Sequence, residues 1–143
     1  MSVVLLDQDS VVDYLISKEV ISASDSAQVE VLTGGVSNVV LAITTATKKL
    51  VLKQALAELA VSEKWEADQR RAIVEANAIE LFNQLSPAQV PKLVFLDPER
   101  FILVLERVPT GSTVWKSDLL AGIINPEVGR LLGNTLATWH NYG

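Results

Sequence analysis

Between residues 27 and 55 the sequence holds three short runs rich in β-branched and aliphatic residues, AQVEVLT, NVVLAITTA and KLVLKQA. A glycine-rich segment, LTGGVSN, separates the first two runs, and a tight ATKK connection joins the last two. Short strand-like runs separated by turn residues are typical of strands that pair with their neighbours in the chain. This part of the sequence therefore predicts an antiparallel meander of three strands.

The remaining segments indicate helices and one further hairpin. Apolar positions at helical spacing predict a short helix within residues 9–21 and a second from about residue 68 to 85, where Ser86 and Pro87 end it. KLVFLD and RFILVLE, joined by the turn DPER, predict a hairpin. NPEVG opens a final helix that continues through RLLGNTLATWH. The predicted fold class is α+β, with a mostly antiparallel five-stranded sheet.

Composition limits the kind of protein this can be. The 143 residues are 49% hydrophobic and 20% charged, which is typical of a globular domain with one core, and no apolar run approaches the ~20 residues of a membrane span. The absence of cysteine excludes disulfides, thiolate metal sites and thiol nucleophiles. A formal charge of -5 with scattered basic residues argues against nucleic acid or membrane partners. The N-terminus has no basic region, so we expect no secretory signal and a cytoplasmic location.

The second predicted strand after the glycine-rich turn carries a lysine. Strand alternation puts Val51 and Lys53 on one face and the leucines beside them on the other. In one interpretation the turn is an ordinary hairpin and the lysine an edge or snorkelling side chain. In the other, the ammonium lies beneath the turn, where it can pair with phosphate oxygens held by backbone N–H groups.

The second helix carries one charged residue on its apolar stripe. Glu75 shares that stripe with apolar residues, whereas Glu80 has mostly polar neighbours one turn away. A carboxylate on a buried stripe requires a partner, because an isolated buried charge is costly. Either Lys53 or Arg71, one turn earlier on the same helix, can supply that partner, and the two contacts are not exclusive.

Taken in order, these features resemble the N-terminal lobe of the protein-kinase-like small-molecule kinases, the aminoglycoside phosphotransferase and choline kinase superfamily. The matching segments are the turn TGGVSN, the strand lysine in LVLKQ, the helix glutamate in RRAIVEANAIELF, the hinge FILVLERVPTG and the helix LLGNTLATWH with its Trp-His. The resemblance implies a protein-kinase-like N-lobe: a five-stranded sheet with one packed helix, an N-terminal helix, and a C-terminal helix leading toward an absent C-lobe. Residues 1–108 would form the nucleotide-binding N-lobe, and residues 109–143 the hinge, linker and first helix toward the missing C-lobe.

The resemblance also implies ATP as the cofactor and assigns roles to individual residues. Gly34, Gly35, Ser37 and Asn38 of the turn would cover the phosphates. Lys53 would bind the α and β phosphates, and Glu75 would hold that lysine in place. Leu105 would lie at the back of the adenine pocket, with the Glu106 carbonyl and the Val108 N–H facing the base. The residues expected to bind the nucleotide are Gly34, Gly35, Ser37, Asn38, Lys53, Glu75, Glu106 and Val108.

The sequence departs from the superfamily in lacking its catalytic and metal-binding aspartates. Phosphoryl transfer requires an aspartate that orients the substrate hydroxyl and side chains that hold Mg²⁺. The sole histidine, His140, is followed by NYG, without an aspartate two places later, and is interpreted as a helix-end residue. Glu106 and Asp118 have ordinary explanations in a hinge and a linker. We therefore expect no catalytic or metal-binding residue in this chain, Mg²⁺ ligands in the absent C-lobe, and no phosphate transfer by this chain alone.

Two classes of function follow from the sequence. The first is the ATP-binding lobe of a kinase that transfers the γ-phosphate to a small-molecule hydroxyl acceptor, truncated before the catalytic loop. The second is a stand-alone, non-catalytic module that binds a nucleotide or serves as an interaction domain. The final helix distinguishes them: a truncated lobe should expose Leu131, Leu132, Leu136 and Trp139, which invites a homodimer through that helix, whereas a complete small domain should bury them.

Overall fold

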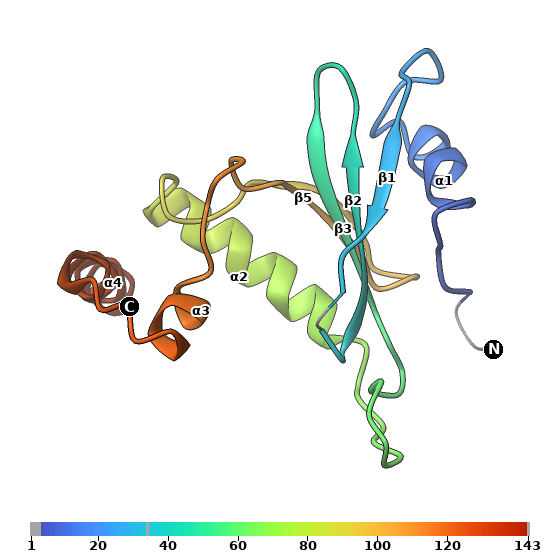
Figure 1. Ribbon diagram of the computed structural model, residues 1–143. Helices are drawn as coiled ribbons and strands as arrows, with labels where there is room; N and C mark the ends of the chain where they lie inside the picture. The colour runs from blue at the N-terminus through green and yellow to red at the C-terminus, as the bar shows by residue number, and fades with distance from the viewer. Residues whose placement is uncertain (1–3, 34, 143) are drawn as a thin grey trace.

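The computed structural model describes residues 4–33 and 35–142, which form an α+β fold (Figure 1). The elements, in chain order, are α1 (Val11–Ser17), β1 (Gln28–Val31), β2 (Asn38–Thr44), β3 (Lys49–Ala55), α2 (Arg71–Leu85), β4 (Leu93–Asp97), β5 (Ile102–Glu106), α3 (Trp115–Leu120) and α4 (Pro126–His140). The predicted fold class is confirmed.

The five strands form one sheet in the order β1-β2-β3-β5-β4, and every neighbouring pair is antiparallel. The meander predicted for residues 27–55 supplies the first three strands, and the DPER hairpin supplies the last two. In this register Lys53 of β3 lies opposite Val40 of β2 and Leu103 of β5. The predicted lysine therefore stands near the middle of the sheet rather than on an edge strand.

Helices α1 and α2 lie on opposite sides of the sheet (Figure 1). The larger apolar cluster includes Leu15 of α1 together with Leu50 and Leu52 of β3. A smaller cluster on the α2 side includes Ala72 together with Leu103 and Leu105 of β5. The alternation of β3 is thus as predicted: its leucines lie on the α1 face, and Lys53 lies on the α2 face.

The first helix is shorter than the 9–21 region in which it is predicted. It ends at Ser17 because Glu19 adopts a left-handed conformation (φ 58°), and the N–H of Val20 then bonds the carbonyl of Leu15 at 2.9 Å. Helical spacing continues past this point in the sequence, but Val20 and Ile21 reach the core from an irregular segment. The helical spacing of apolar residues in the sequence does not reveal the left-handed turn at Glu19, because that turn depends on tertiary packing.

The later helices match the sequence except in one place. Helix α2 ends at Leu85, directly before Ser86 and Pro87, and α4 begins with Asn125, whose side chain accepts the N–H of Glu127 at 3.1 Å. The short helix α3 occupies a stretch predicted as linker. Six residues are too few for a recognisable helical period.

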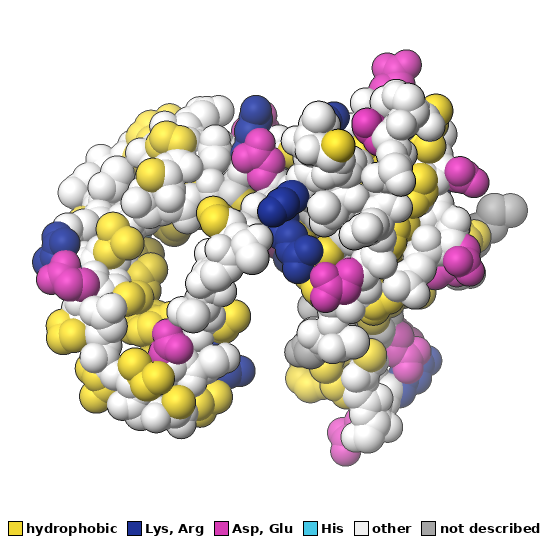
Figure 2. Space-filling model, turned by 45° about the horizontal axis from the view of Figure 1, so that its top comes forward, with side chains coloured by type: hydrophobic (Ala, Val, Ile, Leu, Met, Phe, Trp, Pro, Cys, Tyr) yellow, Lys and Arg dark blue, Asp and Glu magenta, His cyan; other side chains and the backbone are white. Residues whose placement is uncertain are grey.

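The final helix exposes part of its apolar surface. Leu131, Leu132 and Leu136 are each more than 40% exposed, as expected for a lobe that has a further partner. Trp139 differs from that expectation: it is half-buried, stacks on Phe82 at a ring-centroid distance of 3.9 Å and donates to Ser86. Figure 2 shows hydrophobic side chains around a hollow in this C-terminal part. Among the described residues, no helix has the length and apolar character needed to cross a membrane.

Candidate functional site

The centre of the candidate site is an ion pair between Lys53 of β3 and Glu75 of α2. Glu75 faces the sheet because it lies on the stripe of α2 that also buries Ala72 and Ala76. The pair is not sealed, since 24% of the lysine side chain and 37% of the glutamate side chain remain exposed. An ammonium held by one carboxylate and still open to solvent retains donors for a second anion.

Arg71, the other predicted partner of Glu75, makes different contacts. Its guanidinium donates to three backbone carbonyls, those of Ser37 at 2.5 Å, Leu56 at 2.9 Å and Asp68 at 2.9 Å. No ion pair involving Arg71 occurs within residues 4–33 and 35–142. Of the two predicted partners, the one that pairs with Glu75 is therefore Lys53.

The glycine-rich turn lies between β1 and β2, but Gly34 is outside the described residues. A Cβ placed on Gly35 would have no atom within 4 Å, so packing within this chain does not require glycine there. In the part of the chain that the structure describes, the N–H groups of Gly35, Val36 and Ser37 have no acceptor. They are free to bind an anion, as backbone N–H groups do in phosphate-binding turns.

The end of the turn is held by the chain that follows it. The Ser37 carbonyl accepts the N–H of Leu56 at 3.0 Å as well as the Arg71 guanidinium, and the Ala60 N–H bonds the Val36 carbonyl at 2.8 Å. Asn38 opens β2, and its amide donates to the Ser37 hydroxyl at 3.0 Å. The carbonyls of Val36 and Ser37 are thus occupied, while the N–H groups beside them are not.

The segment after β5 is the one predicted to serve as the hinge. Leu105 is buried in the α2-side cluster, and Glu106 is the exposed last residue of the strand. Val108 is 60% exposed, and within the described ranges its N–H has no backbone acceptor. Gly111 adopts a φ of +93°, which lets the chain turn away after Pro109.

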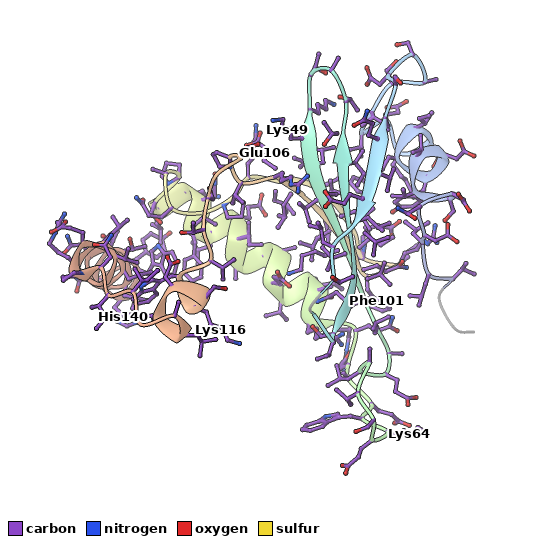
Figure 3. All side chains as sticks on the ribbon, in the orientation of Figure 1. Lys49, Lys64, Phe101, Glu106, Lys116 and His140 are labelled. Carbon is purple, nitrogen blue, oxygen red and sulfur yellow. The ribbon has the colours of Figure 1, made fainter. Side chains whose placement is uncertain are left out.

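An open pocket of about 410 Å³ adjoins the hinge. It is lined by Thr44, Lys49 and residues 107–111. Figure 3 shows Lys49 and Glu106 side by side at this end of the sheet. A second pocket, lined by Leu50, Val94 and Glu106 among others, also borders the hinge, but Leu50 belongs to the α1 face. We consider only the first pocket, because it shares the face of Lys53.

The lysine and the hinge lie at a fixed separation along the sheet. Leu50 pairs with Glu106, and Lys53 pairs with Leu103, so the two positions are three residues apart on β3. At roughly 3.3 Å per residue this spacing is about 10 Å. The distance is comparable to that between the base and the first phosphates of an extended nucleotide.

The remaining candidates lie away from this arrangement. Figure 3 places His140 at the end of α4, far from the sheet. Asp118 accepts the Thr113 hydroxyl at 3.2 Å at the start of α3 and is otherwise in an ordinary surface position. Among residues 4–33 and 35–142, no cluster of three histidine or acidic side chains is arranged to hold a metal ion.

The fold and these contacts define a class of protein: an α+β lobe of the protein-kinase-like kind, with a strand lysine paired to a helix glutamate next to a glycine-rich turn. No family model matches the chain. It is similar to the methylthioribose kinases of Citrobacter koseri (33% identical over 95 residues), Enterobacter sp. (32% over 90) and Bacillus cereus (29% over 111).

These similarities cover 66%, 62% and 74% of this chain, and 24%, 22% and 28% of the respective kinases. The chain thus spans about a quarter of the length of the curated relatives it matches. It is homologous to part of the methylthioribose kinases, which are members of the aminoglycoside phosphotransferase and choline kinase superfamily, and the resemblance found in its sequence is confirmed.

One residue of the site was missed by reasoning from the sequence. The sequence indicates Arg71 only as a partner for Glu75, because the two are one turn apart on the helix. Its contact with Ser37 joins residues 34 apart in the chain. The signal that was available is its place at the first residue of α2, since a long side chain at a helix start can reach the loop packed beside it.

Proposed function

We propose that this chain is the nucleotide-binding lobe of an ATP-dependent small-molecule kinase. The observation that supports the proposal most is the half-open ion pair of Lys53 and Glu75, on the same face of the sheet as the hinge pocket and next to the glycine-rich turn. An ion pair with only a structural role can be fully buried or fully exposed and does not require partial exposure. Partial exposure leaves donors of the lysine directed at solvent, where the phosphates of a nucleotide can accept them.

Each part of the site has a separate task in this proposal. Lys53 binds the α and β phosphates, and Glu75 holds the ammonium in its position. The turn residues Gly35, Ser37 and Asn38, together with Gly34, cover the phosphates with N–H donors. The base lies on the hinge, where the Glu106 carbonyl accepts from the adenine amino group and the Val108 N–H donates to the ring.

The lobe binds nucleotide but does not transfer phosphate by itself. Transfer requires an aspartate that orients the acceptor hydroxyl and oxygen ligands for Mg²⁺, which bridges phosphate oxygens when bound. We place these groups in the part of the kinase that corresponds to the other three-quarters of the relatives. The relatives' name supplies the first acceptor to test with a complementing catalytic lobe, which is methylthioribose.

The exposed leucines of α4 are the contact surface for that catalytic lobe. Leu131 and Leu132 line an apolar pocket of about 340 Å³ with Trp115 and Val128. A homodimer through α4, or a stand-alone interaction module, is the second candidate function, and the same exposed surface favours it. Light scattering separates the two: a monomer that binds ATP supports the lobe, and a stable dimer without ATP binding supports the module.

Calorimetric titration with ATP, with and without Mg²⁺, tests the proposal directly. The 143-residue chain should bind ATP, Lys53→Ala should bind at least about tenfold more weakly because it loses charged hydrogen bonds, and Lys116→Ala should bind like the parent. Lys116 is an equivalent control, since it is an exposed lysine on α3, away from the sheet (Figure 3). Absence of ATP binding by the parent, or equal binding by Lys53→Ala, would contradict the proposal.

A further inference from the structure

The contacts of Arg71 raise a question that the proposed function does not answer. Its side chain joins three segments: the end of the glycine-rich turn at Ser37, the segment that follows β3 at Leu56, and Asp68, shortly before its own helix. Each contact is to a main-chain carbonyl, and one planar guanidinium makes all three. A fork of fixed geometry that bridges carbonyls holds those segments at a fixed spacing.

The bridge lies where the β2–β3 ladder ends. Asn38 pairs with Ala55, and one step beyond that pair the Leu56 N–H donates to the Ser37 carbonyl at 3.0 Å. The Leu56 carbonyl accepts from Arg71 at 2.9 Å. Within the described ranges, the Ser37 N–H does not return a bond to Leu56. The Arg71 guanidinium thus donates to the Leu56 carbonyl in place of the Ser37 N–H, and that N–H remains without an acceptor in the described residues.

Among the described residues the Arg71 guanidinium is not paired directly with a carboxylate, although its charge acts on the nearby Asp68. In the part of the chain that the structure describes, no carboxylate lies within ion-pair distance of Arg71, although its neighbour Arg70 is paired with Asp68 at 2.7 Å. Carbonyl contacts orient a guanidinium but do not neutralise it. The turn therefore has two cations near its base, Lys53 beside Glu75 and Arg71 beside Ser37.

We propose that Arg71 is a positioning residue for nucleotide phosphates: it fixes the glycine-rich turn to α2 and adds positive charge beneath the turn. This inference rests on the proposed function, because the phosphates in question are those of ATP. Helix α2 carries both Arg71 and Glu75, one turn apart, so a single helix sets the position of the turn and of the lysine. The two halves of the phosphate site then move together.

The test compares ligands with and without phosphates. Arg71→Met should weaken ATP binding by about tenfold, because the turn loses its anchor and the phosphates lose a nearby positive charge. It should leave adenosine binding within about twofold, because adenosine occupies only the hinge. Arg70→Met is the matched control: it removes the same charge from the neighbouring position, whose side chain contacts only Asp68, and should leave ATP binding unchanged. Equal weakening of ATP and adenosine by Arg71→Met, or none, would overturn the inference.

A second measurement needs no nucleotide. The amide hydrogens of Leu56 and Ala60, which bond the Ser37 and Val36 carbonyls of the turn, should exchange faster in Arg71→Met and at the parental rate in Arg70→Met, because only the first variant releases the turn. Arg71→Lys, which keeps the charge but loses the planar fork, should show the faster exchange as well. Unchanged exchange in Arg71→Met overturns the anchoring role, whereas failure of the parent chain to bind ATP removes the proposed function and the phosphate role with it.

Discussion

The two faces of the sheet carry polar groups in different ways. On the α1 face the polar side chains are buried and bonded to the chain itself: Asp97 is 5% exposed and Gln54 fully buried. On the α2 face the Lys53 and Glu75 side chains remain partly open to solvent, and the glycine-rich turn beside them leaves N–H groups free in its described part. Polar groups that a fold satisfies internally stabilise it, whereas polar groups left with spare donors are available to a ligand.

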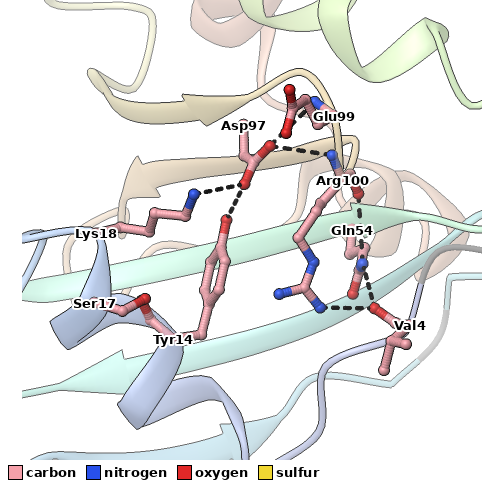
Figure 4. A network of polar contacts seen from close by, with 8 residues as sticks. All are labelled: Val4, Tyr14, Ser17, Lys18, Gln54, Asp97, Glu99 and Arg100. Atoms are coloured by element: carbon pink, nitrogen blue, oxygen red, sulfur yellow. Dashed lines mark hydrogen bonds and ion pairs between the residues drawn. The ribbon is translucent and has the colours of Figure 1, made fainter.

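On the α1 face a network of hydrogen bonds and one ion pair satisfies the buried carboxylate of Asp97 (Figure 4). Asp97 accepts the Tyr14 hydroxyl at 2.9 Å, the Lys18 ammonium at 3.3 Å and the N–H groups of Glu99 and Arg100 at 3.1 Å. Burial raises the pKa of Asp97, but the hydrogen bonds from Tyr14, Arg100 and Lys18 outweigh it and hold that pKa below its usual value. The network ties α1 to the β4–β5 hairpin.

The largest stability effect should come from Asp97. Replacing it by alanine in Asp97→Ala leaves Tyr14 and two N–H groups without their acceptor, and should lower the free energy of unfolding by about 3 kcal/mol. Urea unfolding followed by circular dichroism measures the change. Asp13→Ala, at an exposed position of α1, should cost less than about 0.5 kcal/mol. A similar small loss for both variants would remove the contrast between the two faces.

The pH dependence of stability should reveal the same network. Burial, together with the hydrogen bond to Asp97 and its charge, raises the pKa of Tyr14 above its ordinary value of 10.0. The unfolded chain therefore ionises first, and the stability that Tyr14 contributes is lost as pH rises above about 10. Asp97, whose pKa is lowered, contributes stability that is lost as pH falls below its ordinary 3.8.

Tyr14→Phe isolates that contribution. The variant should lose about 1 kcal/mol at neutral pH, the value of one hydrogen bond, and its stability should fall less steeply than that of the parent above pH 10. Unfolding curves at several pH values compare the two proteins directly. If both curves fall in parallel at high pH, the Tyr14 hydroxyl does not titrate with folding.

A smaller stability effect is expected at the site itself. Glu75→Gln removes a partly exposed ion pair and should change the free energy of unfolding by less than about 1 kcal/mol, while weakening ATP binding by roughly tenfold through the misplaced lysine. Glu80→Gln, on the exposed side of α2, should change neither quantity. A destabilisation as large as that of Asp97→Ala would mean that the α2 face is built for stability like the α1 face.

The smallest effect should come from the pair that joins β1 to the hinge. Arg107 contacts Glu30 at 3.3 Å, and the glutamate side chain is 64% exposed. Glu30→Gln should therefore alter stability by no more than about 0.5 kcal/mol, with the difference vanishing at high salt. Thermal unfolding at two salt concentrations measures it. A larger loss of stability that does not depend on salt would show that the Arg107–Glu30 contact stabilises the fold as a buried contact does.

Much of the fold was predictable because its signals are local. The three-strand meander, the DPER hairpin and the end of α2 before Pro87 follow from turn residues and from alternation within single segments. The face of Lys53 followed from the same alternation, and the inward direction of Glu75 from helical spacing. Their contact could be named as one of two possibilities, but the structure was needed to assign Arg71 elsewhere.

The contacts that sequence reasoning missed are long-range. Tyr14 meets Asp97 across 83 residues, and Trp139 stacks on Phe82, which lies on another helix. Neither pair has a spacing that any local period could indicate. The early end of α1 belongs to the same group, since it depends on how Val20 and Ile21 enter the core.

The sequence by itself determined the α+β class and the order along the chain of the five strands and of helices α1, α2 and α4, because periodicity and turn chemistry are properties of neighbouring residues. Only the tertiary structure decided which carboxylate Lys53 meets, where Arg71 donates and which polar groups are sealed. Those outcomes depend on strand register and helix packing, which bring together groups that the chain keeps far apart.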